Sequence, residues 1–268
     1  MKKTILITGA TDGIGKATAE FLANEGHKVI IHARSEEKGE KTVNTVREKT
    51  GNKTTEFVVA DFTELPDVKN MVSELKNRFE NIDVLINNAG VYRPERTVLK
   101  NGLEETFMVN YLAHFYLTTS LLPLLEKSLQ ARIINVSSMI HATEIDFGNL
   151  QGEKWYDGSD AYSRSKLCNV LFTYKLANLL NKKPITVNAI HPGVINTKLL
   201  VAGWGPVGED VRFAAQRFAF LAEDELLKNT TGKCFSNNHK TNSAPISYIK
   251  EVQDKMWDIS TAIIDKIS

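Results

Sequence analysis

Short apolar runs alternate with longer stretches in which apolar residues recur every three to four positions, from one end of the chain to the other. The short runs predict buried strands at Thr4–Thr8, Lys28–His32, Thr55–Ala60, Asp83–Asn87, Arg132–Ser137, Thr186–His191 and Lys233–Phe235. The longer stretches predict helices over Ile14–Asn24, Glu36–Lys49, Leu65–Phe79, Leu103–Lys127, Ala161–Asn181 and Ile246–Ile267. This alternation indicates β-α-β units, and therefore a parallel sheet with helices on both faces.

The predicted fold is one α/β domain over residues 1–268, doubly wound, with a seven-stranded parallel sheet. Right-handed crossovers leave few ways to arrange these strands, so the expected order is 3-2-1-4-5-6-7, with a nucleotide cleft where the order reverses. No internal repeat or Pro/Ser-rich linker divides the chain. At the start of the fourth helix, Asn101 is expected to cap the first turn and Glu104 to reach back to it.

Two segments interrupt the alternation, His141–Gly158 and Ile195–Thr231, and each follows the carboxyl end of a strand. Open α/β sheets bind ligands at that edge. The second segment combines glycines with Phe213, Phe218 and Phe220, so residues 195–231 are expected to form a substrate loop or lid over an apolar pocket. The alternative is that these aromatic side chains pack an outer helix.

The charge of the chain is almost balanced, with 33 Lys and Arg against 32 Asp and Glu and a net charge of +1. Without a basic block, nothing favours binding to nucleic acid or to an anionic membrane. The apolar runs are too short to cross a bilayer, and Met1–Thr11 is typical of a first strand rather than a signal peptide. We therefore expect a cytoplasmic protein with no membrane anchor, no metal site, and reduced thiols at Cys168 and Cys234.

A glycine-rich turn, Thr8–Gly15, follows the first predicted strand and leads into the first predicted helix. Its glycines, Gly9, Gly13 and Gly15, allow unusual dihedrals and let N–H groups approach a pyrophosphate, whose charge is favoured at a helix N-terminus. The spacing differs from the common G-x-G-x-x-G fingerprint. Alone, this turn is weak evidence for a nucleotide site.

The turn has the form TGxxxGxG, and together with later motifs it makes the sequence resemble the short-chain dehydrogenase/reductase family. The later motifs are Asn87–Gly90 after the fourth strand, Asn110 in the fourth helix, Ser138 after the fifth strand, Tyr162–Lys166 as YxxxK, and Pro192–Gly193 with Thr197 after the sixth strand. The similarity spans Thr8 to Thr197. It implies a Rossmann fold, a nicotinamide cofactor, and a small-molecule substrate that interconverts between alcohol and carbonyl.

Tyr162 and Lys166 lie one helical turn apart and therefore on one face, where an ammonium near a phenol favours the phenolate. That would make the tyrosine a usable acid or base at neutral pH, unless the two are an ordinary amphipathic pair. Ser138 would hydrogen-bond the substrate oxygen; Ser137 is the alternative, and strand alternation lets only one of them face the site. The resemblance implies that Lys166 also binds the nicotinamide ribose and that Asn110 holds a water linking the lysine to solvent.

The gap between Ser138 and Tyr162 is about twice that usual in the main branch of the family. The extra residues, Ala142–Ser159, are expected to loop out above the active site, and they resemble the retinol-dehydrogenase-like branch. His141, close to Ser138, is a candidate substrate contact, with packing of the inserted loop as the alternative. Trp204 is a second candidate substrate contact.

The end of the second strand, His32–Ser35, lacks the carboxylate with which an NAD enzyme binds the adenosine ribose. Arg34 can instead pair with a 2′-phosphate and stack on adenine, and Ser35 can add a hydrogen bond, unless the arginine is merely solvated. Asp61, beside Phe62, would accept from the adenine amino group, with helix capping as its alternative role. We therefore expect NADP(H).

Expected cofactor contacts come from the turn, the strand ends and the resemblance. They are Gly9, Asp12, Gly13, Ile14, Gly15, Arg34, Ser35, Asp61, Phe62, Asn88, Ala89, Gly90, Tyr162, Lys166, Pro192, Gly193, Ile195 and Thr197. Asp12 is a mild contrary sign, because many NADP-preferring relatives have a basic residue at that point.

These features predict an NADP-dependent oxidoreductase with a catalytic set of Asn110, Ser138, Tyr162 and Lys166. The resemblance to the retinol-dehydrogenase-like branch suggests a hydrophobic substrate, such as a retinoid, a steroid or an aldehyde. The alternative is a non-catalytic NADP-binding redox sensor or scaffold; such proteins commonly lose the catalytic set, which this chain retains. Both a homodimer and a homotetramer are left open.

Overall fold

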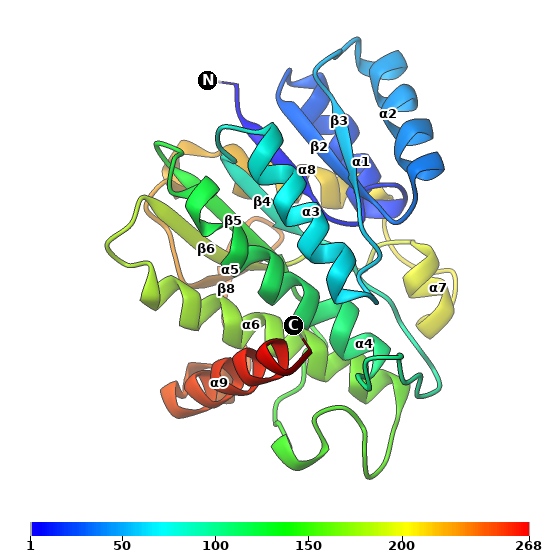
Figure 1. Cartoon of the computed structure of the whole chain (residues 1–268), viewed down its shortest axis with the longest axis vertical. Coiled ribbons are helices and arrows are strands. Elements are labelled where there is room, and N and C mark those ends of the chain that lie inside the picture. Colours follow the sequence, from blue (N-terminus) through cyan, green and yellow to red (C-terminus); the bar gives the residue numbers. More distant parts are fainter. Residues whose placement is uncertain (1, 268) are drawn as a thin grey trace.

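The computed structural model describes residues 2–267, and in them one sheet lies between two layers of helices (Figure 1). Its strands are β1 (Thr4–Ile7), β2 (Lys28–Ala33), β3 (Glu56–Val59), β4 (Val84–Asn87), β5 (Ala131–Val136), β6 (Ile185–His191), β7 (Lys233–Ser236) and β8 (His239–Thr241). The first seven pair in parallel in the order β3-β2-β1-β4-β5-β6-β7, which confirms the predicted topology.

The strand β8 corrects the predicted count of seven, because it extends the sheet to eight strands and pairs antiparallel with β7. The connection turns through Asn237 and Asn238, whose φ angles are 46° and 63°. Tight two-residue hairpin turns need such positive φ values, and asparagine tolerates them. All three β8 residues are exposed, so no apolar run marks this strand in the sequence.

The helices are α1 (Gly13–Asn24), α2 (Glu36–Thr50), α3 (Leu65–Arg78), α4 (Glu105–Phe107), α5 (Ala113–Leu125), α6 (Gly158–Leu179), α7 (Lys198–Trp204), α8 (Val211–Glu223) and α9 (Lys250–Ile267). Short 3-10 turns are η2 (Phe147–Asn149), η3 (Glu225–Leu227) and η4 (Pro245–Tyr248). The helix predicted over Leu103–Lys127 is divided, because the π-helical turn η1 (Met108–Leu112) separates α4 from α5.

The cap of α4 also differs from the prediction. The Glu104 carboxylate accepts from the Thr106 and Phe107 N–H groups at 2.8 and 2.7 Å, so Glu104 is itself the N-cap. Asn101 instead accepts from the N–H of Leu103, two residues on, as an asparagine does in a local turn. The helix therefore begins four residues after the predicted cap.

Alternate residues of the strands face two separate apolar layers. On one side Leu6 and Ile30 pack with α3, α5 and α6; on the other Ile5 and Ile7 pack with α1, α2 and α8. The last helix, α9, lies against α6 (Figure 1). Parallel strands buried on both faces agree with the near-continuous apolar runs in the sequence.

The segment expected to be a lid, residues 195–231, has two parts with different surroundings. None of the seven residues of α7 is buried. In contrast, α8 packs on α1, and its Phe218 is fully buried in the core while Phe213 is exposed. Phe218 thus packs an outer helix, and only the part of the segment around α7 lies over the carboxyl edge of the sheet.

The carboxyl ends of β1 to β6 border a cavity of 620 Å³. Because parallel strands all end at the same edge, the polar residues that follow each strand gather around this cavity. Within residues 2–267, no helix is long and apolar enough to span a membrane.

Candidate active site

The cavity is lined by most of the residues that the sequence singled out. They are Gly9, Asp12, Gly13, Ile14, Gly15, Arg34, Asp61, Phe62, Asn88, Ala89, Gly90, Ser138, Tyr162, Lys166, Pro192, Gly193, Ile195, Thr197 and Trp204. Three singled-out residues lie outside its lining: Ser35, at the start of α2, the buried Asn110, and His141. Among the described residues, no cluster of His, Cys, Asp or Glu could hold a metal ion.

The glycine-rich turn packs directly on the loop after β4. Gly9 has a φ of 62°, and a Cβ atom there would lie 2.8 Å from the Ala89 Cα. A Cβ atom at Gly15 would collide with the Gly9 carbonyl oxygen. Asp12 caps α1 by accepting from the Gly13 N–H at 2.8 Å. The turn therefore presents backbone at close range, which is the arrangement that lets N–H groups bind phosphate oxygens.

Thr8 and His114 fix the loop after β4 relative to this turn. The Thr8 hydroxyl accepts from the N–H groups of Asn88 and Ala89 at 2.8 and 2.9 Å. It also bonds His114 Nε2 at 2.9 Å, while His114 Nδ1 lies 3.1 Å from the carbonyl oxygen of Asn110. Burial lowers the pKa of His114 to about 3, so the ring is neutral. Its Nδ1 donates to Asn110 and its Nε2 accepts from Thr8.

His32 ties the glycine-rich turn to the end of β3. Its Nδ1 accepts from the Gly9 N–H at 3.0 Å and its Nε2 donates to the Ala60 carbonyl at 2.9 Å. Burial lowers its pKa to about 4, and the neutral ring stacks on Phe62 with centroids 4.2 Å apart. Neither His32 nor His114 was expected from the sequence to have a role. The signal available in the sequence was a histidine within an otherwise apolar run.

Two cations stand at the end of the cavity bordered by β2. Arg34, directly after β2, and Lys38, in the first turn of α2, are both exposed side chains that line it. Lys38 was not predicted, although it follows Arg34 by four residues. Asp61 also lines this end, and its carboxylate already accepts from the Thr63 N–H and hydroxyl at 2.9 and 2.8 Å.

Tyr162 and Lys166 project from α6 into the middle of the cavity, with Lys166 Nζ 5.4 Å from the centroid of the phenol ring. The ammonium donates to the Val136 carbonyl at 3.1 Å. Burial lowers the pKa of Lys166 to about 8. Burial also raises the pKa of Tyr162 above its ordinary value, against a smaller opposing effect of Ser138. The net shift is therefore opposite to the expected one, because desolvation disfavours the phenolate more than the Ser138 hydrogen bond favours it.

The two adjacent serines after β5 have different surroundings. Ser137 is buried, and its hydroxyl donates to the Lys166 carbonyl at 2.9 Å. Ser138 is half-buried, and its hydroxyl accepts from the Ile140 N–H at 3.3 Å. Because Ser137 is already committed to α6, Ser138 is the serine available to a substrate in the cavity.

Asn110 lies in the π-helical turn η1, fully buried beneath the loop after β4. Its Oδ1 accepts from the Val91 N–H at 2.7 Å, and its Nδ2 donates to the Val91 carbonyl and the Ser165 hydroxyl at 3.0 and 3.1 Å. Gly90 separates it from Lys166, since a Cβ atom at Gly90 would lie 3.4 Å from Asn110 Oδ1. Asn110 therefore joins the loop after β4 to α6.

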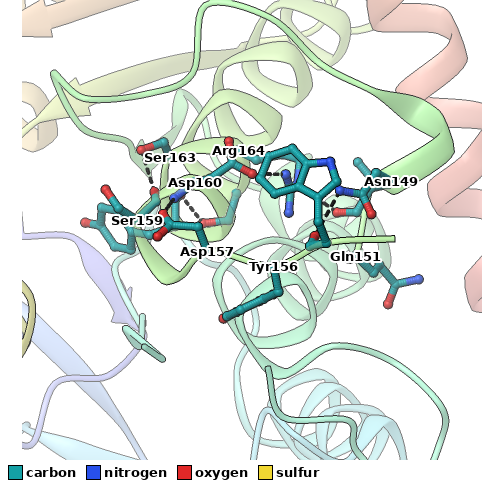
Figure 2. A network of polar contacts seen from close by, with 12 residues as sticks. Asn149, Gln151, Tyr156, Asp157, Ser159, Asp160, Ser163 and Arg164 are labelled. Carbon is teal, nitrogen blue, oxygen red and sulfur yellow. Dashed lines mark hydrogen bonds and ion pairs between the residues drawn. The ribbon is translucent and has the colours of Figure 1, made fainter. Parts of the chain in front are cut away.

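The insertion of residues 142–159 is a folded loop docked on the start of α6 (Figure 2). Asn149, fully buried, donates to the Trp155 carbonyl at 3.0 Å, and Arg164 of α6 donates to the Leu150 carbonyl at 2.9 Å. Tyr156 donates to the Arg93 carbonyl at 2.9 Å. None of residues 142–159, all of which lie in the described part of the chain, lines the cavity. The loop therefore braces the wall of the cavity from outside rather than lying above it.

The side of the cavity next to Tyr162 is apolar and aromatic. The Trp204 ring at the end of α7 lies 5.6 Å from the Tyr162 ring and 5.0 Å from that of Tyr92, which the sequence analysis did not single out. Leu199 and Leu200 line the same part of the cavity. At the other end of α7, Lys198 pairs with Asp12 at 2.5 Å and holds the pKa of that carboxyl below its ordinary value.

The cavity fits a dinucleotide with a nicotinamide. Gly9 and Gly15 let the turn pack tightly, since added Cβ atoms there would collide with Ala89 and with the Gly9 carbonyl, and the two cations Arg34 and Lys38 stand at one end. His191 lines the wall as well, and its buried Nδ1 has no hydrogen-bond partner among the described residues, so it is available to a bound polar group.

Comparison with known proteins agrees with this geometry. Residues 3–203 match the family model described as short chain dehydrogenase. Retinol dehydrogenase 13 of Mus musculus is 37% identical over 98% of this chain and 84% of its own length. Retinol dehydrogenase 12 and polyprenol dehydrogenase, both of Homo sapiens, are 35% and 33% identical, each over 98% of this chain and 86% of their own.

Solved structures share the fold. A crystal structure of an uncharacterized protein from Mycobacterium paratuberculosis superposes with a TM-score of 0.82 at 28% identity, over 98% of this chain and 93% of that one. Salutaridine reductase from Papaver somniferum has a TM-score of 0.71 at 21% identity, over 87% of this chain and 99% of its own.

Proposed function

Because the chain belongs to the short-chain dehydrogenase family, we propose that it is an oxidoreductase that uses NADP(H) to interconvert a hydrophobic alcohol and its carbonyl. One observation carries the proposal: Tyr162, Lys166 and Ser138 line the same cavity whose opposite end is bordered by Arg34 and Lys38. A dinucleotide with its phosphates at the glycine-rich turn spans these two ends. The non-catalytic sensor or scaffold has no comparable observation in its favour.

The choice of NADP(H) rests on charge at the end of β2. Arg34 and Lys38 line the cavity there, where an NAD enzyme would have a carboxylate. A 2′-phosphate brings negative charge, which a planar guanidinium and an ammonium can bind together. The carboxylate of Asp12, nearer the glycine-rich turn, is paired with Lys198, so its repulsion of a phosphate is reduced.

The proton chemistry belongs to Tyr162. Since burial raises its pKa, the phenol is protonated at neutral pH and can donate to a carbonyl oxygen. Ser138 orients that oxygen, and the nearby charge of Lys166 stabilises the phenolate that remains. The nicotinamide, when bound, supplies or accepts the hydride. In this arrangement neutral pH favours carbonyl reduction, and oxidation of an alcohol needs a higher pH.

An apolar substrate is supported by the lining of the cavity beside Tyr162. Met139 and Val207 line the cavity and are exposed, at 62% and 51%, and Leu199, Leu200 and Trp204 complete an apolar wall. Burying such a wall against a hydrophobic substrate is favourable by about 25 cal/mol per Å². The names of the retinol and polyprenol dehydrogenases also denote apolar alcohols as the substrates of those relatives.

Replacement of Arg34 by Asp tests the cofactor. We expect the Kd for NADPH to rise roughly 10- to 100-fold, because a charge-assisted hydrogen bond is lost, and the Kd for NADH to stay the same. Binding is measured by nicotinamide fluorescence, with exposed Lys53→Asp as the control for the same kind of charge change away from the cavity. Unchanged discrimination between the two cofactors would refute the assignment.

A further inference from the structure

A polar cluster fixes the segment before α9 to α6. The Tyr174 hydroxyl of α6 bonds the Ser243 hydroxyl at 2.7 Å, and Ser243 in turn bonds the Ser247 hydroxyl at 2.7 Å. The Ser243 N–H donates to the Tyr248 hydroxyl at 3.0 Å. Tyr174, Ser243 and Ser247 are buried, whereas Tyr248 is exposed, so the hydroxyl contacts of the two serines with Tyr174 are protected from water. Ala244, next in the chain, therefore has a defined position relative to α6.

His141 connects Ala244 to the catalytic loop after β5. Its Nδ1 lies 2.6 Å from the Ser138 carbonyl oxygen, and its Nε2 lies 2.9 Å from the Ala244 nitrogen. A backbone N–H can only donate, so Nε2 accepts and carries no proton. The proton of the neutral ring is then on Nδ1, which donates to Ser138. Both ring nitrogens are used, which leaves neither for a substrate.

The loop that carries Ser138 is held at its start by Ser137, whose N–H donates to the Ile190 carbonyl at 2.8 Å and whose hydroxyl donates to the Lys166 carbonyl at 2.9 Å, but from Ser138 onward it has few other contacts. Met139 and Ile140 are 62% and 41% exposed and contribute little burial. Within the loop, the His141 N–H donates to the Ser138 carbonyl at 3.2 Å, and beyond it the Ala142 N–H donates to the Ser163 carbonyl at 3.0 Å. The imidazole of His141 thus provides the link from Ser138 to a different part of the chain, some hundred residues later.

We propose that His141 is a positioning residue, which holds Ser138 beside Tyr162 by linking its carbonyl to the N–H of Ala244. This inference rests on the proposed function. It also brings Ala244, about forty residues beyond the end of the family match at residue 203, into the construction of the active site. His141 acts through Ser138 and does not itself transfer a proton to the substrate.

Two substitutions remove the hydrogen bond between His141 and Ala244, one at each partner. His141→Ala deletes the imidazole, whereas Ala244→Pro removes the N–H that Nε2 accepts from and puts the proline Cδ in its place against the imidazole, at a φ of −54° that a proline ring adopts. We expect each to lower kcat for a carbonyl substrate roughly 10- to 100-fold, the effect of misplacing a reacting group by about 1 Å, with the KM for NADPH unchanged. The double variant should be no worse than either single variant.

Coupling to Ser138 separates positioning from a general loss of structure. In a Ser138→Ala background, His141→Ala should have no further effect on kcat, because the group that it positions is gone. His239→Ala, an exposed histidine on β8, is the matched control and should behave as wild type. Near wild-type kcat in both single variants, or an equal loss with and without Ser138, would overturn the proposal.

A measurement without turnover keeps this proposal distinct from the proposed function. If the wild-type chain reduced no carbonyl with NADPH, the proposed function would fail, yet the link could still be examined by ¹⁵N NMR of the His141 imidazole. The expected spectrum shows a protonated Nδ1 and an unprotonated Nε2 in the wild type, and a changed Nε2 shift in Ala244→Pro. A protonated Nε2, or an Nε2 shift unaffected by Ala244→Pro, would overturn the link whatever the activity.

Discussion

Lys166 is a charged residue inside the fold. The charge that the proposed function needs therefore lowers the stability of the folded chain. The side chain is 3% exposed, and burial lowers its pKa from 10.5 to about 8. At neutral pH the folded chain must therefore hold an ammonium that water would solvate better. Its one acceptor, the Val136 carbonyl, also receives the Asn169 amide at 3.3 Å, so this oxygen keeps a partner without the lysine.

Lys166→Met should raise the free energy of unfolding at pH 7 by about 3 kcal/mol, from the shift in pKa. The sign follows from linkage. Below pH 8 both states are charged and the penalty of burial is complete; between pH 8 and 10.5 the folded state loses its proton first and the penalty disappears. Urea unfolding at pH 7 and at pH 10.5 measures this, with exposed Lys240→Met as control. A gain equal at both pH values would contradict it.

Replacing Gly9, and Gly51 for comparison, distinguishes the cost of a positive φ angle from the cost of a steric clash. Gly51, at the end of α2, has a similar φ of 69° but no atom within 4 Å of an added Cβ, whereas at Gly9 the Ala89 Cα is 2.8 Å away. Gly51→Ala should lower the free energy of unfolding by about 1 kcal/mol and Gly9→Ala by about 2–4 kcal/mol. Only Gly9→Ala should also weaken NADPH binding. Equal losses in urea unfolding would show that Ala89 gives way.

At the level of elements, the sequence predicted those features that depend on the local hydrophobic pattern and on the handedness of the crossovers. The seven parallel strands and their order follow from apolar runs and right-handed crossovers, and both are present. β8 could not be predicted this way, because its turn depends on the positive φ of Asn237 and Asn238 and it buries nothing. The π-helical turn around Asn110 is equally invisible, since the apolar pattern from Leu103 to Lys127 continues through it.

The helix α9 covers an aromatic surface on α5 and α6. The Trp257 ring lies 5.0 Å from that of Phe115 and 6.0 Å from that of Phe172. Trp257→Ala should therefore lower the free energy of unfolding by about 2–4 kcal/mol. Trp155, 55% exposed on the insertion, is the matched control, and its replacement should change stability by less than about 0.5 kcal/mol. Circular dichroism in urea decides, and similar losses for both variants would exclude this role of α9.

On the scale of the whole molecule, the site could be predicted where its residues directly follow strands. The glycine-rich turn, Ser138 and Tyr162 share one cavity because parallel strands end at one edge. The residues that fix these parts relative to one another were missed. His32 joins Gly9 to β3, and His114 joins Thr8 to the π-helical turn, through contacts between segments far apart in the sequence. Such contacts have no local pattern, so only the folded chain reveals them.

The direction in which the pKa of Tyr162 is shifted also depends on the whole fold. The spacing from Lys166 indicated a lowered pKa, but α6 is packed into the core and burial acts on both groups. Phenol and ammonium are each pushed towards their neutral forms. In the proposed function, Tyr162 accordingly starts as a protonated phenol at neutral pH.

Turnover by Tyr162→Phe separates an active reductase from a protein that only binds a nucleotide. The variant keeps the ring and its packing and removes the hydroxyl that donates the proton. We expect kcat for NADPH-dependent reduction of an apolar carbonyl to fall about 100- to 10,000-fold, with the Kd for NADPH unchanged. Tyr156→Phe, which loses a hydroxyl outside the cavity, should keep wild-type kcat. A Tyr162→Phe variant that turned over at the wild-type rate would place the proton donor elsewhere and contradict the proposed mechanism.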